Sequence, residues 1–385
     1  MKTTLLLVNV VAILVGVSYG MHGPILPVFA KNVIGATYTE LGLIGLANFI
    51  PYMFIPIFVG ILLDRYNNGH LLSIGVVINS ASLYLLSIAQ TVPEVMVFRV
   101  MTGVAHAFFW PPCESIISSV SKGHERVKNI AKFTGFFVAG FTIGPLLGSL
   151  FLESFDVSYR MLFQFAAFIL AAAIVASLSL SKRHIHRHDA KFSFSSIKEM
   201  GKFPEIIIML MYCTASFGMI LTIYPAFLDD NSMSGTQIEI LYFVFGVSRI
   251  ITLVVAGKLA RRTSHTLIAA TLSIAFGLII SFGAETMLEF AIALLIMGFG
   301  FSIFFPLTLE IILSKTRKEI SGTIIGAYET TFGIGWAIGP ITAGLLSQFQ
   351  DNTAPYFVFF ILGIGVTILS AIRRKSLEPK RNQNV

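Results

Sequence analysis

Long apolar blocks separated by short polar connections dominate this chain of 385 residues. A helix needs about 20 mostly apolar residues to cross a bilayer, and the blocks reach that length. Only 12% of the residues are charged, which excludes a water-soluble globule. The blocks are predicted to be helices, because the strands of a membrane barrel show short alternating segments instead. The sequence therefore predicts an all-α membrane protein.

Hydropathy places twelve transmembrane spans, which puts both termini on one side of the membrane. The predicted spans cover residues 5–29, 39–62, 71–90, 94–118, 129–152, 159–181, 204–228, 237–257, 266–284, 288–313, 322–347 and 355–372. The first block also resembles a signal peptide. Its apolar character continues for about 25 residues, however, so we read it as the first spanning helix.

The distribution of positive charge predicts the orientation. Of the 27 Lys and Arg residues, all but Lys31, Arg160, Arg99 and Arg249 fall in segments on the side of the termini. Because basic residues accumulate in cytoplasmic loops, we expect a multi-pass protein of the plasma membrane with both termini in the cytoplasm. Topology thus explains the net charge of +7, and no basic face with interleaved aromatic residues indicates nucleic-acid binding.

An internal repeat divides the chain into two similar sets of six spans. An offset of 195 residues relates the glycines and proline of two motifs, taking Gly140, Gly144 and Pro145 to Gly335, Gly339 and Pro340. An offset of 198 relates matching residues of 18–29 to 216–227. We expect an N-terminal half at 1–181, a cytoplasmic linker at 182–203, and a C-terminal half with a short basic tail at 204–385. Such halves suit rocking about a central site near the midplane.

No cofactor or metal is predicted. The linker carries His184, His186, His188 and Asp189, which could bind a metal, but imidazoles in a basic loop are more often a solvated tether. Cys113 and Cys213 lie in apolar blocks of different halves and define no disulfide framework. The chain has no P-loop pattern, so ATP is not expected to drive it.

Three motifs resemble those of the major facilitator superfamily, and the resemblance covers the whole chain. After the second span, Gly60, Asp64 and Arg65 match the first part of G-x-x-x-D-R-x-G-R-[RK], while the later basic pair is missing. In the fourth span, Arg99 and Gly103 match R-x-x-x-G. The G-x-x-x-G-P-x-x-G pattern of the family's exporters is matched in the fifth span by Gly140, Gly144, Pro145 and Gly148.

The resemblance implies the major facilitator fold, with twelve helices in two pseudo-symmetric halves, and a secondary transporter. The exporter pattern and the proline pair in GPILPVF are similar to the drug:proton antiporter branch. Asp64 and Arg65 are predicted to latch the halves, although they could simply set topology. The glycines and prolines of the fifth span, and their copy in the eleventh, could form a hinge or only allow close helix packing.

Ionisable residues inside spans are functional candidates, because burying them in a bilayer is costly. Arg99, His106 and Trp110 follow helical spacing in the fourth span and are predicted to line one cavity wall near the midplane. The alternative for His106 is packing against another helix. His22, in the outer part of the first span, could line the cavity or lie at the interface.

Acidic residues are predicted at two depths. Glu114 and Glu310 lie near the cytoplasmic ends of their helices and are expected to pair with basic loops as gate residues. Glu329 occupies the position where the family's vesicular amine:proton antiporters, by resemblance, carry a coupling acid. Arg249 lies at a similar depth and is predicted to pair with Glu329 in one state and leave it in the other. The alternatives are a permanent ion pair or a glutamate that reaches toward the cytoplasmic interface.

The leading hypothesis is a monomeric transporter that exports small organic or drug-like molecules in exchange for protons, with the lipid bilayer as its surroundings. An uptake symporter for a nutrient is the first alternative, because a fold does not determine direction. A receptor or scaffold that transports nothing is the second. An enzyme is not expected, since neither a metal cluster nor a credible catalytic triad is present.

Overall fold

The computed structural model describes residues 2–63, 66–121, 123–155, 157–181, 201–316 and 321–379, without the side chains of residues 57, 61, 123–127 and 321–326. Nearly all of these residues are helical, and the described ranges contain no strand. A helix satisfies its own backbone hydrogen bonds, which is what a chain of such apolar blocks requires inside a bilayer. The prediction of an all-α membrane fold is confirmed.

The helices form two consecutive sets. The first set comprises α1 (Lys2–His22), α2 (Ile25–Asn32), α3 (Tyr38–Leu63), α4 (Asn68–Ile88), α5 (Val92–Ala107), α6 (Trp110–Val120), α7 (Gly123–Ser154) and α8 (Tyr159–Ser181). The second set comprises α10 (Pro204–Thr222), α11 (Tyr224–Asp230), α12 (Gly235–Leu259), α13 (Thr263–Gly283), α14 (Met287–Lys315), α15 (Ser321–Phe349) and α16 (Ala354–Ile372). Short 3₁₀ turns, η1 (Ala260–Arg262) and η3 (Arg374–Leu377), follow α12 and α16.

The helix lengths fit the predicted spans. Ten stretches of the described chain are long and apolar enough to cross a membrane. One of them, Gly235–Gly283, contains both α12 and α13, and α15 adds another helix of 29 residues. With the pairs α1 and α2, α5 and α6, and α10 and α11 each counted as one span, the structure accommodates all twelve predicted spans.

Three spans predicted as continuous helices are broken, and proline explains each break. Pro24 precedes α2, and Pro225 lies in the first turn of α11. Pro111 and Pro112 follow Trp110 in the first turn of α6 and remove two N–H donors in succession, so α5 ends at Ala107. In the second half, the repeat equivalent of Pro111 is Pro306 of α14. A second proline does not follow it, and α14 stays continuous. The hydropathy profile could not reveal these breaks because the residues around them remain apolar.

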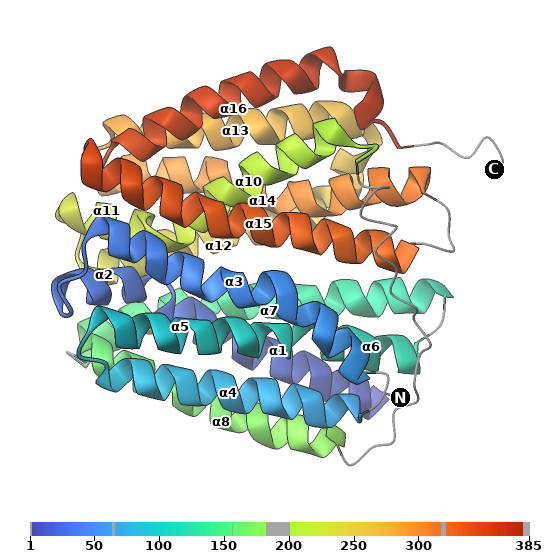
Figure 1. Ribbon diagram of the computed structural model, residues 1–385, viewed down its shortest axis with the longest axis horizontal. Coiled ribbons are helices and arrows are strands. Elements are labelled where there is room, and N and C mark those ends of the chain that lie inside the picture. The colour runs from blue at the N-terminus through green and yellow to red at the C-terminus, as the bar shows by residue number, and fades with distance from the viewer. Residues whose placement is uncertain are drawn as a thin grey trace.

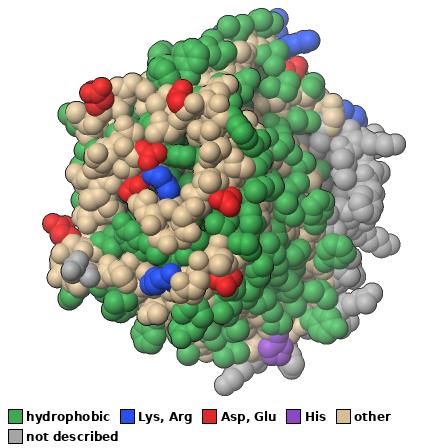
Figure 2. All heavy atoms as spheres, turned by 60° about the vertical axis from the view of Figure 1, so that its left-hand side comes forward, with side chains coloured by type: hydrophobic (Ala, Val, Ile, Leu, Met, Phe, Trp, Pro, Cys, Tyr) green, Lys and Arg blue, Asp and Glu red, His purple; other side chains and the backbone are tan. Residues whose placement is uncertain are grey.

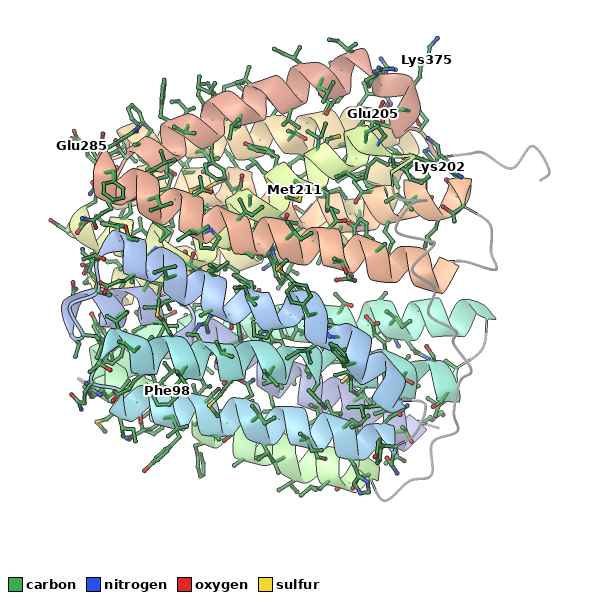
Figure 3. All side chains as sticks on the ribbon, viewed as in Figure 1. Phe98, Lys202, Glu205, Met211, Glu285 and Lys375 are labelled. Carbon is green, nitrogen blue, oxygen red and sulfur yellow. The ribbon has the colours of Figure 1, made fainter. Side chains whose placement is uncertain are left out.

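The two sets of helices lie on opposite sides of a seam (Figure 1). Contact across the seam is made mainly by α3 with α15 and by α7 with α12. We call the end where the chain begins and finishes the terminal end, and the opposite end the far end. Glu285 lies at the far end, whereas Lys202, Glu205 and Lys375 lie at the terminal end (Figure 3).

The outer surface of the helix bundle is apolar. Large side chains point outward from its helices, including Phe168, which is 77% exposed, and Val254, which is 80% exposed. Figure 2 shows green apolar side chains covering the side of the molecule, with acidic and basic side chains gathered toward the far end. In water this surface would cause aggregation, whereas in a bilayer it contacts lipid tails.

Glycines allow the central helices to pack against each other. A Cβ added at Gly144 of α7 would lie 2.6 Å from the backbone nitrogen of Met21 in α1. In the second half, a Cβ at Gly339 of α15 would lie 2.8 Å from the Cα of Ala215 in α10. The predicted packing role of these glycines is therefore present in both halves, whereas the hinge role stays a prediction.

Gly144→Ala is expected to destabilise the protein by about 1–3 kcal/mol, because the new methyl group forces α1 and α7 apart. The measurement is the thermal unfolding midpoint of the purified protein in detergent. Gly135→Ala is the matched control in the same helix, since nothing lies within 4 Å of its added Cβ. An alanine there improves helix propensity and is expected to keep or raise the midpoint. Equal midpoints for the two variants would contradict the packing argument.

Candidate functional site

A cluster of basic and aromatic side chains lies at the centre of the first half. The Tyr19 ring on α1 lies 4.7 Å from the His106 ring on α5 and 5.2 Å from the His22 ring on α1, measured between ring centroids. Arg99 is 5% exposed and lies close enough to interact electrostatically with both imidazoles. The predicted proximity of Arg99 and His106 is present, and His22 belongs to the same cluster.

This cluster keeps unused hydrogen-bonding capacity. His22 donates from Nδ1 to the carbonyl oxygen of Ser18 at 2.6 Å. Its Nε2, the Nε2 of His106 and the Nε of Arg99 are buried without a partner among the described residues. Buried polar atoms normally have partners, so atoms left without one mark a place where a polar ligand can bind.

Trp110 does not continue this surface. Because α5 ends before the tandem prolines, Trp110 begins a new helix and packs against Phe137 and Phe133 of α7, at centroid distances of 4.9 and 5.2 Å. The prediction of one helical face from Arg99 to Trp110 is therefore wrong beyond His106. The aromatic rings still connect the two regions, because Phe141 lies between Phe137 and Tyr19.

Arg249 of α12 lies in an aromatic cage that crosses the seam. Its guanidinium lies 5.1 Å from the ring centroid of Phe217, 5.6 Å from that of Phe245 and 5.4 Å from that of Phe141. Phe141 belongs to α7 of the other half. The predicted pair with Glu329 is not formed among the described residues in this state, because cation–π contacts hold the guanidinium instead. Its Nε has no described hydrogen-bond partner.

A small cavity of about 20 Å³ lies between the halves, beside Arg99. Arg99 and Phe141 line it from the first half, and Thr222 and Tyr242 line it from the second. The volume suits about one water molecule rather than an organic ligand. This cavity therefore has no room for an organic ligand in the present state.

Two carboxyl groups approach each other across the seam on the side of the terminal end. Glu114 of α6 is close enough to Glu329 of α15 for the two to interact electrostatically, and Tyr52 of α3 lies near both. Glu114 is exposed and Glu329 is half-buried. Glu310 is also exposed and forms no ion pair among the described residues. The predicted pairing of Glu114 and Glu310 with basic loops therefore stays a prediction.

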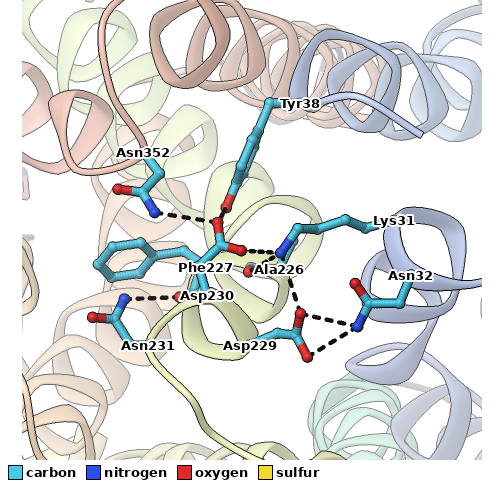
Figure 4. Close-up of polar contacts among 9 residues, drawn as sticks. All are labelled: Lys31, Asn32, Tyr38, Ala226, Phe227, Asp229, Asp230, Asn231 and Asn352. Atoms are coloured by element: carbon cyan, nitrogen blue, oxygen red, sulfur yellow. Dashed lines mark hydrogen bonds and ion pairs between the residues drawn. The ribbon is translucent and has the colours of Figure 1, made fainter. Parts of the chain in front are cut away.

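A polar cluster, which we call the latch, joins the halves at the far end (Figure 4). It consists of Lys31, Asn32, Tyr38, Asp229, Asp230 and Asn352. The Nζ of Lys31 pairs with Asp229 at 3.2 Å and also with Asp230. The Tyr38 hydroxyl donates to Asp230 at 2.6 Å, and the Asn352 amide donates to the same oxygen at 3.2 Å.

The latch is stable at neutral pH. Burial by itself would raise the pKa of Asp230, but the hydrogen bonds from Lys31, Tyr38 and Asn352 outweigh it and lower the pKa below its ordinary value. The stability contributed by this lowered pKa is present at pH values above the ordinary pKa of about 4 and is lost as the pH falls through the lowered value. Asp230 is therefore ionised throughout the physiological range.

The two halves thus meet along a seam, are joined by the latch at one end and carry basic groups near the centre. A sequence model of the Major Facilitator Superfamily matches residues 8–340 and 206–384. The chain belongs to the Major Facilitator Superfamily. The family resemblance inferred from the motifs is thereby confirmed.

This superfamily member is similar to several known proteins along its whole length. It is 25% identical over 400 residues to the quinolone resistance protein NorA of Staphylococcus aureus strain Mu50, covering 98% of this chain and 97% of that protein. It is 23% identical over 365 residues to an uncharacterized MFS-type transporter of Methanocaldococcus jannaschii, covering 92% of this chain and 94% of that one.

Solved structures share the fold. The nucleoside transporter NupG superposes with a TM-score of 0.77 at 15% identity, covering 99% of this chain and all of that one. A bacterial homologue of the human lysosomal transporter Spinster gives a TM-score of 0.79 at 14% identity, covering 100% of this chain and 99% of that one. The superfamily member described here is thus a multi-pass membrane transporter for small molecules, and its relatives are transporters rather than enzymes.

Two predicted elements of this transporter fall outside the described residues. They are the motif pair Asp64 and Arg65 after α3 and the His-rich stretch of the linker. Sequence reasoning also missed Asp229 and Asp230 of the latch. The repeat contained the signal, because the offset of 198 that relates the first and seventh spans takes Lys31 to Asp229.

Proposed function

We propose that this major facilitator transporter exports small organic molecules in exchange for protons by alternating access. The observation that carries the proposal is the asymmetry of the seam. The latch closes the far end, whereas toward the terminal end Glu114 and Glu329 approach each other from opposite halves and remain accessible. Rocking of the halves would break the latch and bury the acid pair.

Substrate would bind where the halves meet at the centre. Arg99, Arg249 and the two central histidines offer hydrogen-bond donors or acceptors that have no described partner. The aromatic rings around Arg249 offer apolar contact for the body of an organic molecule. This combination of a mostly apolar wall and a few polar groups is typical of small-molecule sites.

Protons would bind at the acid pair. Two carboxyl groups that interact repel each other when both are ionised, and a proton bound by either one relieves that repulsion. A substrate or a movement of the halves that separates them would release that proton. Because the two groups belong to different halves, proton binding and rocking are coupled directly.

The similarity to NorA, a quinolone resistance protein, supports export of organic compounds. We also propose that the transporter is a monomer in the plasma membrane. The distribution of basic residues supports an orientation with the terminal end in the cytoplasm. In that orientation, the acid pair of the present state faces the cytoplasm, which is the side from which an exporter takes up its substrate.

A flux assay in proteoliposomes tests this function. Vesicles containing the purified transporter are given a pH gradient, acidic inside, and a fluorescent amphiphilic dye is added outside. We expect the dye to accumulate inside while protons leave, and an equal sodium gradient to drive nothing. Accumulation only with an acidic exterior would instead establish a proton symporter. The absence of flux under every gradient would favour a protein that does not transport.

His106→Ala is expected to weaken substrate binding about three- to tenfold, corresponding to one lost hydrogen bond in the central cluster. Equilibrium binding of the transported dye to purified protein measures the effect. His265→Ala is the control, because His265 is exposed in α13. Unchanged affinity at every pH would assign His106 to helix packing alone.

A further inference from the structure

Glu239 is a buried acid that no part of the proposed transport cycle uses. It follows the first turn of α12, whose start is fixed by a capping box between Ser234 and Gln237. Its side chain is completely buried, and neither carboxyl oxygen has a hydrogen-bond partner among the described residues. Such an acid needs a physical explanation, because a buried group without partners is costly.

The carboxyl group of Glu239 lies against the other half of the protein. A Cβ added at Gly148 of α7 would lie 2.6 Å from its Oε1 and 2.8 Å from its Cδ. One turn earlier, Gly235 approaches the side chains of Tyr159 and Leu152 in the first half. The last glycine of the exporter pattern therefore provides the space that the Glu239 carboxyl group fills.

Charged groups nearby do not compensate this acid. The described titratable groups on α12 besides Glu239 are Tyr242, Arg249 and Lys258. Those on the elements beside it are Lys31 on α2, Lys128, Lys132 and Glu153 on α7, Tyr159 and Arg160 on α8, Tyr224, Asp229 and Asp230 on α11, Glu289, Glu310 and Lys315 on α14, and Arg261 and Arg262 on η1. Arg249 lies ten residues further along α12, about 15 Å away, and is held by cation–π contacts, and Arg160 donates to the Ser87 carbonyl. Lys258, Lys128, Lys132, Glu310 and Lys315 lie toward the opposite ends of their helices. Lys31 pairs with the two aspartates, Tyr224 is hydrogen-bonded to Ser281, and Tyr242 donates to the Ile220 carbonyl. Glu153 and the two arginines of η1 are exposed, and Glu289 caps its own helix.

Burial therefore decides the charge of Glu239 in this state. A carboxylate without partners inside a bilayer costs several kcal/mol. The positive end of α12 would favour the ionised form by about 0.3–1 kcal/mol, and that effect fades beyond the first turn. The neutral acid fits the closed seam, whereas the carboxylate does not.

We propose that Glu239 is a proton-binding site that controls closure of the seam at the far end. When α7 and α12 separate there, the carboxyl group meets water and transfers its proton to a water molecule on the far side. Closure requires the reverse transfer, in which the carboxylate takes a proton from hydronium on the same side. The proton returns to the side from which it came, so this site sets the conformation without carrying protons across.

This inference rests on the alternating-access part of the proposed function, but not on the substrate or on the coupling acids. It predicts that acidity on the far side favours the closed latch. For one proton, the ratio of closed to open protein changes by up to tenfold per pH unit on the alkaline side of the titration. With the predicted orientation, the transporter would sense external pH.

Distance measurement without substrate tests the proposal. Cysteines replace Gln90 and Glu285, which are exposed at the far end in different halves, in a background lacking Cys113 and Cys213. Spin labels on these cysteines report the separation of the halves by electron–electron double resonance in lipid nanodiscs between pH 5 and 9. With Glu239 present, we expect the fraction of protein that is open at the far end to grow as the pH rises.

The Glu239→Gln variant is expected to stay closed across this range, because glutamine is neutral at every pH. If the glutamine variant does not yield folded protein, Glu239→Met replaces it. Methionine has a similar length and is apolar, so this variant is also expected to stay closed. Glu153→Gln removes an exposed acid at the same end of α7 and should keep the wild-type response.

A pH response that persists in Glu239→Gln would overturn the proposal, as would a wild-type protein whose distances ignore pH. A response that instead disappears in the Glu114→Gln/Glu329→Gln double variant would assign it to the acid pair and would likewise overturn the inference. The proposed transport function is judged separately by dye flux, which does not enter this measurement.

Discussion

Replacing Glu329 with glutamine is expected to abolish proton-driven accumulation of substrate while preserving exchange of substrate for substrate. Glutamine cannot bind the proton that the proposed function assigns to Glu114 and Glu329, but it keeps the size of the side chain. A gradient of two pH units supplies about 2.7 kcal/mol per proton, enough for about a hundredfold concentration of substrate. The variant is expected to reach only equal concentrations on both sides.

Two assays on the same vesicles separate coupling from transport. Dye accumulation under a pH gradient measures coupling, and efflux of loaded dye into excess unlabelled substrate measures exchange. Glu285→Gln, which removes an exposed acid at the far end, is the control and should accumulate dye normally. If the two acids act as one proton site, as proposed, Glu114→Gln/Glu329→Gln should lose no more coupling than either single variant. Accumulation by Glu329→Gln at the wild-type rate would place the coupling acid elsewhere.

Replacing Lys31 with alanine is expected to shift the protein toward the state that is open at the far end. The change removes both ion pairs of the latch and leaves two consecutive aspartates without their cation. Lys31 and Asp229 are only 22% and 21% exposed, so their attraction is less screened than that of a surface pair. We expect a loss on the order of 1–2 kcal/mol, or about five- to thirtyfold in the equilibrium between states.

Reaction of a buried cysteine measures this shift. Leu41 lines the central cavity and is 1% exposed, so Leu41→Cys should react slowly with a membrane-impermeant maleimide added at the far end. Lys31→Ala should accelerate the reaction, whereas Lys258→Ala, which removes an exposed cation from the end of α12 near the terminal end, should not. A partial return to the slow reaction in the exchanged variant Lys31→Asp/Asp229→Lys would identify charge pairing as the cause. Equal rates in all variants would show that helix packing alone closes the far end.

The spans were predictable because each depends only on its own residues. Apolar blocks of membrane length form helices wherever they occur, and their ends were placed to within a few residues. The close-packed glycines could also be located, because only a small residue permits two helices to approach so closely. The breaks before Pro24 and Pro111 were missed because an apolar sequence can continue after a helix has stopped.

The site was less predictable, because it depends on how helices from distant parts of the chain are turned toward one another. Counting residues along a helix gave a predicted depth for Glu329, but it could not show that Glu114 would lie close enough to interact with it. Glu239 was overlooked because an acid near the end of a span ordinarily reaches the lipid headgroups. Its burial is determined by Gly148, which belongs to the other half.

The positions of Lys31 and Asp229 have a consequence for the history of the chain. They are 198 residues apart, at equivalent places in the two copies of the repeat, and they touch across the seam, as residues beside a two-fold axis do. In a dimer of identical subunits, equivalent residues at such an axis face their own copies, so a lysine would confront a lysine. Only after the two copies had been fused into one polypeptide could one position become basic and its twin acidic. The Lys31–Asp229 pair therefore requires the two copies to differ, which a single fused polypeptide allows and a dimer of identical subunits does not.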